Sequence, residues 1–346
     1  MVVVQKDAQG RQVICRTDAD EKEGFTFLSI MDKVDVFPPD YEQLDGFKEN
    51  VYYLVTHHDV KVGFVCRFVL EEMMTVVPTS LFQETFTVDN ERHFIRFNSE
   101  IFETRNTQLD QIARLMQKNP QSKIQGLKGW RDEQYAIWIK KTPYVLVERA
   151  LSGALGIITL GAHINGYVID YATQEIKLWI SRRAATKPTW PLMLDNIIAG
   201  GLGYPYGPYE TAVKESLEEA NLEKPIIERY LKSVGVVSYF YYQGNAQKDM
   251  FNSEGSFITG EAQFLYDLEL PPTVIPEPND GEVDSFTLMS LQEVVDALKN
   301  GEFKPNCAMV TLEFLIRHGY VTAENEPNYL TILSKMHRRF PFPTLS

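Results

Sequence analysis

The stretch that decides both the fold and the chemistry of this chain is AGGLGYPYGPYETAVKESLEEANL, at residues 199–222. Its first half is rich in Gly, Pro and Tyr, which predicts a loop, and residues 208–220 predict a helix. Glu215, Glu218 and Glu219 are spaced i, i+3 and i+4, so their carboxylates share one face of that helix. Each like-charged pair weakens a helix by roughly a few tenths of a kcal/mol, so the crowding calls for an explanation.

Two interpretations of this acidic face are open. One is an ordinary solvated surface, which is what charge runs usually form. The other is a divalent cation site, because a cation cancels the repulsion and carboxylate oxygens suit Mg²⁺ or Mn²⁺. The glycine-rich loop before the helix favours the cation site, since glycines let a backbone approach the phosphates that Mg²⁺ typically also binds.

The segment resembles the signature of the Nudix hydrolases, which is Gly, five residues, Glu, seven residues, then Arg-Glu-apolar-x-Glu-Glu-x-Gly-apolar. With Gly200 in the first position, the three helix glutamates and Leu222 match in register. Four positions depart from the signature, and they are occupied by Tyr206, Lys214, Ser216 and Asn221.

The four departures differ in weight. Asn221 is mild, because Asn tolerates the left-handed conformation at a helix end, and Ser216 is small. Tyr206 and Lys214 replace a Glu and an Arg that commonly pair in the family and steady the metal-binding helix. The three glutamates can bind a metal without that Glu–Arg pair. The rate of hydrolysis, however, could be lower without it.

The resemblance extends along roughly residues 24–340. Its further blocks are IKLWISRRAATKPTWPLMLDNIIAGG before the box, DGEVDSF after it, GLKGWRDEQYAIW upstream and CAMVTLEFLIRHGYVT near the end. Together they are similar to one subfamily of fungal and plant Nudix proteins with a distinctive N-terminal domain. In some fungi the same two-domain unit is fused to thiamine pyrophosphokinase.

The flanking sequence predicts strands at Gly156–Leu160, Tyr167–Asp170 and Ile176–Ser181, and an amphipathic helix at Cys307–His318. Interleaved strands and helices favour layered α/β or α+β architectures. The resemblance narrows this to an α/β fold, a Nudix α/β/α sandwich with a mixed sheet, preceded by a smaller α+β domain.

The expected domain limits follow the same reasoning. The N-terminal α+β domain is placed at 24–140, and the Nudix domain with its C-terminal helices at 141–346. The polar run at Lys140–Pro143 is predicted to be the linker between them. Residues 1–23 are polar enough to be disordered.

The resemblance also implies the roles of the central residues. Glu215, Glu218 and Glu219 would bind Mg²⁺ or Mn²⁺, together with a backbone carbonyl at or beside Gly200. The candidate general base is Glu282 in DGEVDSF, with Glu219 as the second choice. A solvated loop carboxylate is the alternative for Glu282.

Cations for the substrate phosphates are expected from Arg182, Arg183 and Lys187, just before the box, and Gly201 would allow close approach. Adjacent strand residues point to opposite faces, so at most one of the two arginines should face the site. Surface salt bridges are the alternative for each. His163 could line the same cleft, or could be a structural turn residue.

The leading functional interpretation comes from the named subfamily. It implies Mg²⁺-dependent cleavage of thiamine diphosphate and its oxidised analogues, oxythiamine and oxothiamine diphosphate, to the monophosphate and phosphate, as metabolite repair. Two alternatives stay open. One is an ADP-ribose or NADH type of pyrophosphatase, and the other is a non-catalytic diphosphate-binding module.

Composition limits the classes of partner. The 346 residues carry a formal net charge of −13, whereas coating nucleic acid or an anionic membrane requires Lys and Arg. The partner is therefore expected to be a small-molecule diphosphate, with no nucleic acid and no membrane. Three widely separated cysteines and a start without a signal-peptide pattern predict a cytoplasmic protein.

Overall fold

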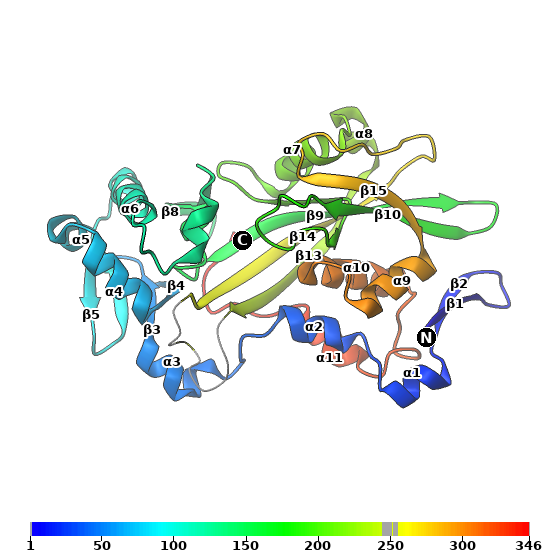
Figure 1. Cartoon of the computed structure of the whole chain (residues 1–346), viewed down its shortest axis with the longest axis horizontal. Helices are drawn as coiled ribbons and strands as arrows, with labels where there is room; N and C mark the ends of the chain where they lie inside the picture. Colours follow the sequence, from blue (N-terminus) through cyan, green and yellow to red (C-terminus); the bar gives the residue numbers. More distant parts are fainter. Residues whose placement is uncertain (1, 244–250, 252–254, 346) are drawn as a thin grey trace.

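The computed structural model describes residues 2–243, 251 and 255–345 of the chain (Figure 1). The first part of the chain alternates short helices with short strands. Its elements are β1 (Val3–Lys6), β2 (Gln12–Cys15), α1 (Asp18–Glu23), α2 (Leu28–Val34), α3 (Asp45–Asn50), β3 (Val51–Val55), β4 (Lys61–Cys66), α4 (Arg67–Val76), α5 (Thr79–Thr85), β5 (Phe86–Asp89), β6 (Phe94–Phe97), α6 (Phe102–Gln117), β7 (Gln134–Ile139) and β8 (Thr142–Glu148).

The remainder of the chain contains the long strands. Its elements are β9 (Ile158–Asp170), β10 (Glu175–Arg183), β11 (Leu194–Asp195), β12 (Ile198–Gly201), α7 (Pro208–Ala220), α8 (Lys224–Tyr230), β13 (Leu231–Gln243), β14 (Phe257–Glu269), β15 (Val283–Ser290), α9 (Leu291–Asn300), α10 (Pro305–Arg317) and α11 (Tyr329–Lys335).

The central sheet is mixed and has seven strands. Its main order is β11-β10-β9-β14-β13, with β12 paired to β9 and β15 paired to β10. The β9–β14 pair is parallel, whereas the other pairs are antiparallel. The long strand β9 pairs with β10 through residues 166–170 and with β12 through residues 161–164, so the sheet splits between these two partners.

Helices cover both faces of this sheet. Ala212 and Ala220 of α7 pack in one apolar cluster with Leu160 and Ile164 of β9, while Tyr167 of β9 packs on the opposite side with residues of α9 and α10. Figure 1 shows α7 and α8 on one side and α9 and α10 on the other. The predicted α/β/α sandwich with a mixed sheet is confirmed.

Strand β9 runs unbroken through the two strands predicted at 156–160 and 167–170. Glycines keep it in the sheet where neighbouring side chains cross it. A Cβ on Gly161 would overlap the Gln263 side chain, and a Cβ on Gly166 would overlap Ile197. The sequence predicts two separate strands here. The glycines between them instead belong to one strand and make room for side chains of neighbouring segments.

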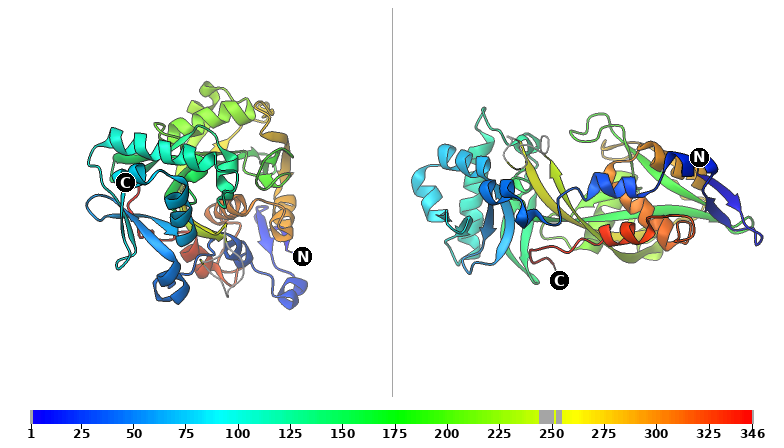
Figure 2. Two further views of the ribbon diagram at one scale, coloured as in Figure 1. Left: turned by 60° about the vertical axis from the view of Figure 1, so that its left-hand side comes forward. Right: turned by 90° about the horizontal axis from the view of Figure 1, so that it is seen from below.

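The first part of the chain builds a second sheet of order β4-β3-β6-β5 and the hairpin β7–β8. Its apolar cluster extends from Tyr52 to Ile157. The predicted linker at Lys140–Pro143 is instead the turn and start of the β7–β8 hairpin, because Ile137 and Val145 on its two strands enter this cluster. Figure 2 shows this part at one end of the long strands.

The start of the chain lies elsewhere. Residues 3–15 form the hairpin β1–β2, and Val2 and Ile14 are buried in the same cluster as α2, α9 and α10. Helix α2 contacts α10 and α11 (Figure 1). This segment, for which disorder was considered, thus packs through its few apolar residues. The division of the chain into domains at 140/141 stays a prediction.

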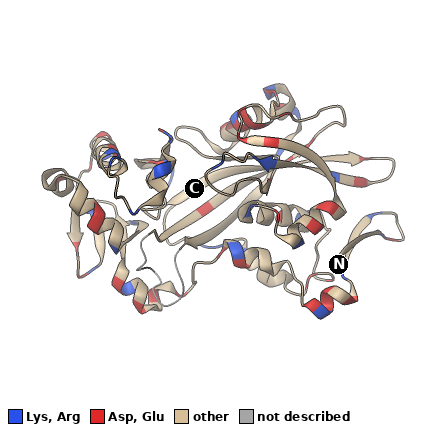
Figure 3. Cartoon of the chain, in the orientation of Figure 1, with Lys and Arg blue, Asp and Glu red and all other residues tan. Residues whose placement is uncertain are grey.

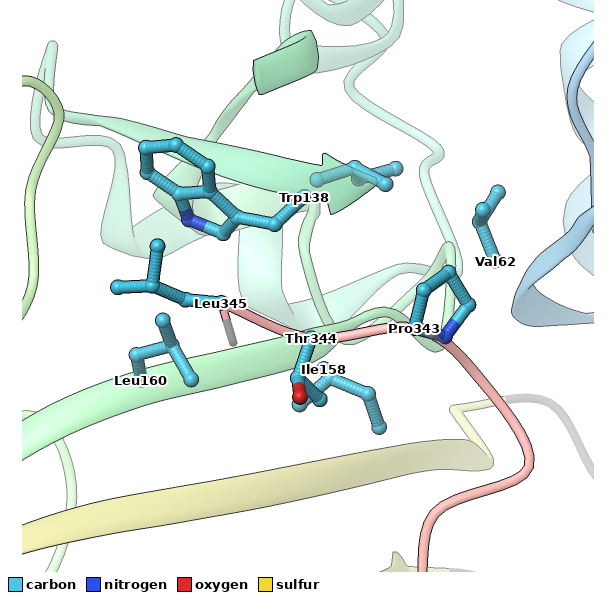
Figure 4. Close-up of a pocket in the computed structure, with 8 residues that line it drawn as sticks. Val62, Trp138, Ile158, Leu160, Pro343, Thr344 and Leu345 are labelled. Atoms are coloured by element: carbon cyan, nitrogen blue, oxygen red, sulfur yellow. The ribbon is translucent and has the colours of Figure 1, made fainter. Parts of the chain in front are cut away.

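The C-terminal segment packs beside the first residues of β9. A small apolar pocket there is lined by Val62, Ile137, Trp138, Ile158, Leu160, Pro343, Thr344 and Leu345 (Figure 4). Its lining includes no charged residue, which makes it unsuited to a phosphate compound.

Charged side chains are interspersed over the fold, with Lys and Arg placed among Asp and Glu (Figure 3). No helix in the described part of the chain is long and apolar enough to cross a membrane.

Gly156 joins the two parts of the chain and gives a stability prediction. Its φ of 59° lies in the left-handed region, and a Cβ there would overlap the backbone of Phe64. We expect Gly156→Ala to lower the free energy of unfolding by about 1–2 kcal/mol from backbone strain and by a further ~1–3 kcal/mol from overpacking. Denaturant unfolding of the two proteins measures the difference.

The matched control is Gly10→Ala, whose φ is 79° and whose added Cβ would meet no atom within 4 Å. It should show only the backbone part of the loss. Equal losses for the two variants would contradict the close approach at Gly156.

Candidate active site

Helix α7 begins and ends where the sequence predicts, at 208 and 220. Pro208 occupies the first turn, and the Glu210 carboxylate accepts a hydrogen bond from the Gly207 N–H at 2.9 Å. Asn221 ends the helix with a φ of 53°, the left-handed conformation expected for it. Local residues therefore set both helix ends.

The glycine strand β12 packs directly on this helix. Glu219 is buried and accepts a hydrogen bond from the Ala199 N–H at 3.0 Å. A Cβ on Gly200 would overlap the Glu215 side chain, so only glycine fits there. The Glu218 side chain is more exposed, with 46% of its surface accessible to solvent. The structure thus brings Gly200 and the three predicted ligands together.

Lys214 lies among these carboxylates. Its Nζ is 3.0 Å from Glu215 Oε1 and 2.6 Å from Glu218 Oε2. The ammonium supplies part of the positive charge that the acidic face requires, and a divalent cation bound there would compete with it. Tyr206, the other residue of the paired departure from the signature, is exposed, and it lines a surface pocket together with Lys214 and Glu215.

Burial sets the protonation of the two inner carboxyls. Burial raises the pKa of Glu219 well above its usual value, and the neighbouring Glu215 carboxylate raises it further. Burial also raises the pKa of Glu215, which Lys214 opposes. The oxygen donors of these carboxyls suit a divalent cation such as Mg²⁺ or Mn²⁺. Because the carboxyls must be ionised to bind it, binding should release protons.

Glu282 precedes β15 and is held by two cations. Arg131 Nη1 donates to Oε1 at 3.0 Å, and Lys187 Nζ pairs with Oε2. Burial alone would raise the pKa of Glu282, but these ion pairs lower it to about 2. A carboxylate of such low basicity is a poor proton acceptor at neutral pH, so the pairing favours positioning over the predicted general-base role.

The two predicted arginines hold a loop. Arg183 donates to the carbonyl oxygens of Thr189 and Trp190 and to Asp195 Oδ2, at 2.9, 3.0 and 2.9 Å. Arg182 donates to the Leu192 carbonyl at 2.8 Å. These bonds shape the segment that carries Lys187. The Lys187 ammonium pairs with Glu282, and its charge lowers the pKa of Glu219.

The N-terminal part of the chain reaches this site through β7. The Gln134 carbonyl accepts from the Tyr204 N–H at 2.7 Å, and a Cβ on Gly201 would overlap the Tyr135 hydroxyl. Arg149 pairs with Glu133 at 2.7 Å beside them. Gly201 therefore makes room for the Tyr135 side chain, whereas the sequence predicts that it makes room for the substrate.

A pocket of ≈ 280 Å³ lies between these segments. It is lined by Asp132, Glu133, Gln134, Leu146, Gly201, Gly203, Tyr204, Tyr206, Thr211, Lys214 and Glu215. Sequence reasoning missed the contribution of 132–134. The only signal was the block GLKGWRDEQYAIW, to which no role could be attached.

A second polar cluster fills the split in the sheet. Cys307 Sγ donates to Asp195 Oδ1 at 2.6 Å, and His163, within β9 and not in a turn, contacts Asn196 Oδ1 at 2.9 Å. The ligand atoms of His163, Asp195 and Cys307 lie within 4.8 Å of one another. The cations Lys304 and Arg183 lower the pKa of Asp195 against the effect of burial, and their charges oppose a metal ion there.

The burial of Glu219 predicts an unusual dependence of stability on pH. Because its pKa is raised in the folded chain, the unfolded chain releases this proton first, and stability falls as pH rises above 4.5. Without metal, Glu219→Gln should therefore have the higher melting temperature at pH 8, and a smaller advantage at pH 5.

Millimolar Mg²⁺ should then raise the melting temperature of the wild type and have less effect on the variant, by mass action. Thermal melts at both pH values, with and without Mg²⁺, measure this. The control is Glu228→Gln, which changes an exposed carboxylate on α8. An equal Mg²⁺ response in the wild type and Glu219→Gln would contradict the assignment of Glu219 as a ligand.

The chain is similar to one family model, to one relative along its whole length and to two relatives over part of its length. The model of a domain of unknown function, DUF4743, matches residues 42–159. The uncharacterized protein YJR142W of Saccharomyces cerevisiae is 57% identical over 343 residues, which cover 99% of each chain.

Two plant proteins carry a functional name. Nudix hydrolase 20, chloroplastic, of Arabidopsis thaliana is 35% identical over 216 residues, which cover 62% of this chain and 54% of the plant protein. Nudix hydrolase 24, chloroplastic, of the same plant is 35% identical over 213 residues, which cover 61% and 54%. The chain spans about half the length of these two relatives. Over about three fifths of its length the chain is therefore similar to these two plant Nudix hydrolases.

Proposed function

We propose that this protein is a Nudix hydrolase that cleaves the diphosphate of thiamine diphosphate and of its oxidised analogues, oxythiamine and oxothiamine diphosphate. The products would be the monophosphate and phosphate, and the role would be metabolite repair in the cytoplasm. The diphosphate chemistry is supported chiefly by one observation, the pair formed by the buried Glu219 carboxyl on the Ala199 N–H and the partly buried Glu215 side chain against Gly200. The thiamine moiety is supported by the sequence resemblance to the subfamily fused to thiamine pyrophosphokinase.

Mg²⁺ or Mn²⁺ would be held by Glu215, Glu218 and Glu219 with a backbone carbonyl at or beside Gly200. When bound, such an ion neutralises charge on the transferred phosphoryl group and activates water. The protein itself supplies a preorganised arrangement. The Ala199 N–H fixes the Glu219 carboxyl, and packing against Gly200 fixes Glu215.

Lys187 would contact the substrate phosphates, because Arg182 and Arg183 donate to backbone carbonyls of the loop whereas the Lys187 ammonium pairs with Glu282. Arg182 and Arg183 would act indirectly, by shaping the segment that presents Lys187. For the proton-accepting role Glu282 is disfavoured, since its two ion pairs lower its pKa to about 2, and Glu219 remains the second choice.

A non-catalytic diphosphate-binding module is the second candidate, and one observation favours it. Lys214 already occupies two of the three expected ligand carboxylates. If the ammonium holds its place against Mg²⁺, the pocket binds a diphosphate without cleaving it.

The test is a panel of diphosphates measured side by side with Mg²⁺. Phosphate release is followed with thiamine diphosphate, its two oxidised analogues, ADP-ribose and NADH. We expect turnover of the thiamine-type compounds. Preference for ADP-ribose or NADH would contradict the proposed substrate, and binding without release would support the non-catalytic alternative.

Replacing one ligand tests the placement of the chemistry. Glu219→Gln removes an anionic oxygen with little change of shape, so turnover of the preferred substrate should fall at least about a hundredfold, as expected for a lost electrostatic term. Steady-state kinetics of this variant, the wild type and Glu228→Gln measure the effect. Turnover near that of the wild type in Glu219→Gln would place the chemistry elsewhere.

A further inference from the structure

We infer that Arg131, contributed by the N-terminal part of the chain, binds a substrate phosphate together with Lys187, and that Glu282 positions both cations. This inference rests on the proposed diphosphate hydrolase function and extends it. It assigns a role in the site to a segment that lies within the match to a domain of unknown function.

The first support is the local charge. Arg131 and Lys187 come from different segments, yet both pair with the single carboxylate of Glu282. Among these three side chains alone, two cations on one carboxylate leave an excess of positive charge, whereas a simple salt bridge between two segments needs only one cation. The excess charge suits an anion with several oxygens, such as a diphosphate.

The second support is unused donor capacity. Arg131 Nη1 donates to Glu282, but in the described part of the chain Nε and Nη2 have no hydrogen-bond partner. A guanidinium offers a planar fork of donors that matches phosphate oxygens. By contrast, Arg183 donates to three acceptors at the root of the 184–193 loop.

The third support is location. Arg131 directly precedes 132–134, which line the same pocket as Glu215 and Gly201. Lys187 pairs with the same Glu282 carboxylate as Arg131, through its other oxygen. The carboxylate therefore joins Lys187 to a cation that directly adjoins the pocket-lining segment.

The position of Arg131 is also fixed in advance. Its backbone N–H donates to the buried Glu148 carboxylate at 3.1 Å, which also accepts from the Ala150 N–H at 3.3 Å. Its side chain is held by Glu282. A donor that is already oriented loses less entropy on binding than a free surface side chain.

The experiment compares Arg131→Gln, Arg131→Lys, Lys187→Gln and the wild type. Arg114→Gln is the matched control, because Arg114 contacts Asp132 of the same segment at 3.3 Å and lies outside the site. Two quantities are measured: KM and kcat for thiamine diphosphate with Mg²⁺, and the affinity for imidodiphosphate, a diphosphate analogue that is not cleaved. Melting temperatures report folding.

We expect Arg131→Gln to weaken imidodiphosphate binding and to raise KM by roughly tenfold to a hundredfold, the scale of a lost charge-assisted hydrogen bond. Lys187→Gln should act in the same direction, and Arg131→Lys should recover part of the loss. Arg114→Gln should leave both quantities near their wild-type values.

Unchanged imidodiphosphate affinity in a folded Arg131→Gln variant would overturn the inference. So would a loss of stability with unaltered affinity, because that result indicates a purely structural salt bridge. If the wild type cleaves no member of the panel, the proposed function fails instead. The imidodiphosphate measurements need no turnover and still test Arg131 in that case.

Discussion

One electrostatic constraint governs the site: the buried Glu219 carboxyl and the partly buried Glu215 carboxyl both lie against the glycine strand β12. Ionising both is unfavourable unless positive charge is close, which is why their pKa values are raised. Lys214 supplies some of that charge from the outer side of α7. A divalent cation, bound through oxygen ligands, would complete the compensation, and the burial that opposes ionisation would then strengthen the electrostatic interaction.

A second feature follows from how the two parts of the chain meet. The N-terminal part does not simply precede the sheet; its strand β7 contacts the glycine loop through Gln134 and Tyr135. Glu282 then connects this part to the segment that carries Lys187. The N-terminal part thereby forms one wall of the pocket, which explains why a substrate site could depend on residues outside the family signature.

Features set by neighbouring residues could be predicted from the sequence, whereas features set by contacts between distant residues could not. Helix 208–220 could be predicted at both ends, because Pro208 and Asn221 act within one turn of the chain. The polar run at Lys140–Pro143 predicts a linker, but it forms the turn and start of the β7–β8 hairpin, because the strands on either side are buried against distant partners. The pairing of Glu282 with Arg131 could not be predicted, because the two residues are far apart in sequence. The contact of Cys307 with Asp195 likewise joins residues far apart in sequence.

The central claim is that the α7 glutamates bind the metal. Anomalous diffraction from crystals grown with Mn²⁺ and imidodiphosphate tests it most directly, because the anomalous signal locates manganese without assumptions about activity. We predict a peak bounded by carboxylate oxygens of Glu215, Glu218 and Glu219, near the Gly200 carbonyl, with Lys214 displaced. A peak only at other residues, or an α7 that keeps Lys214 in place and carries no manganese, would contradict it.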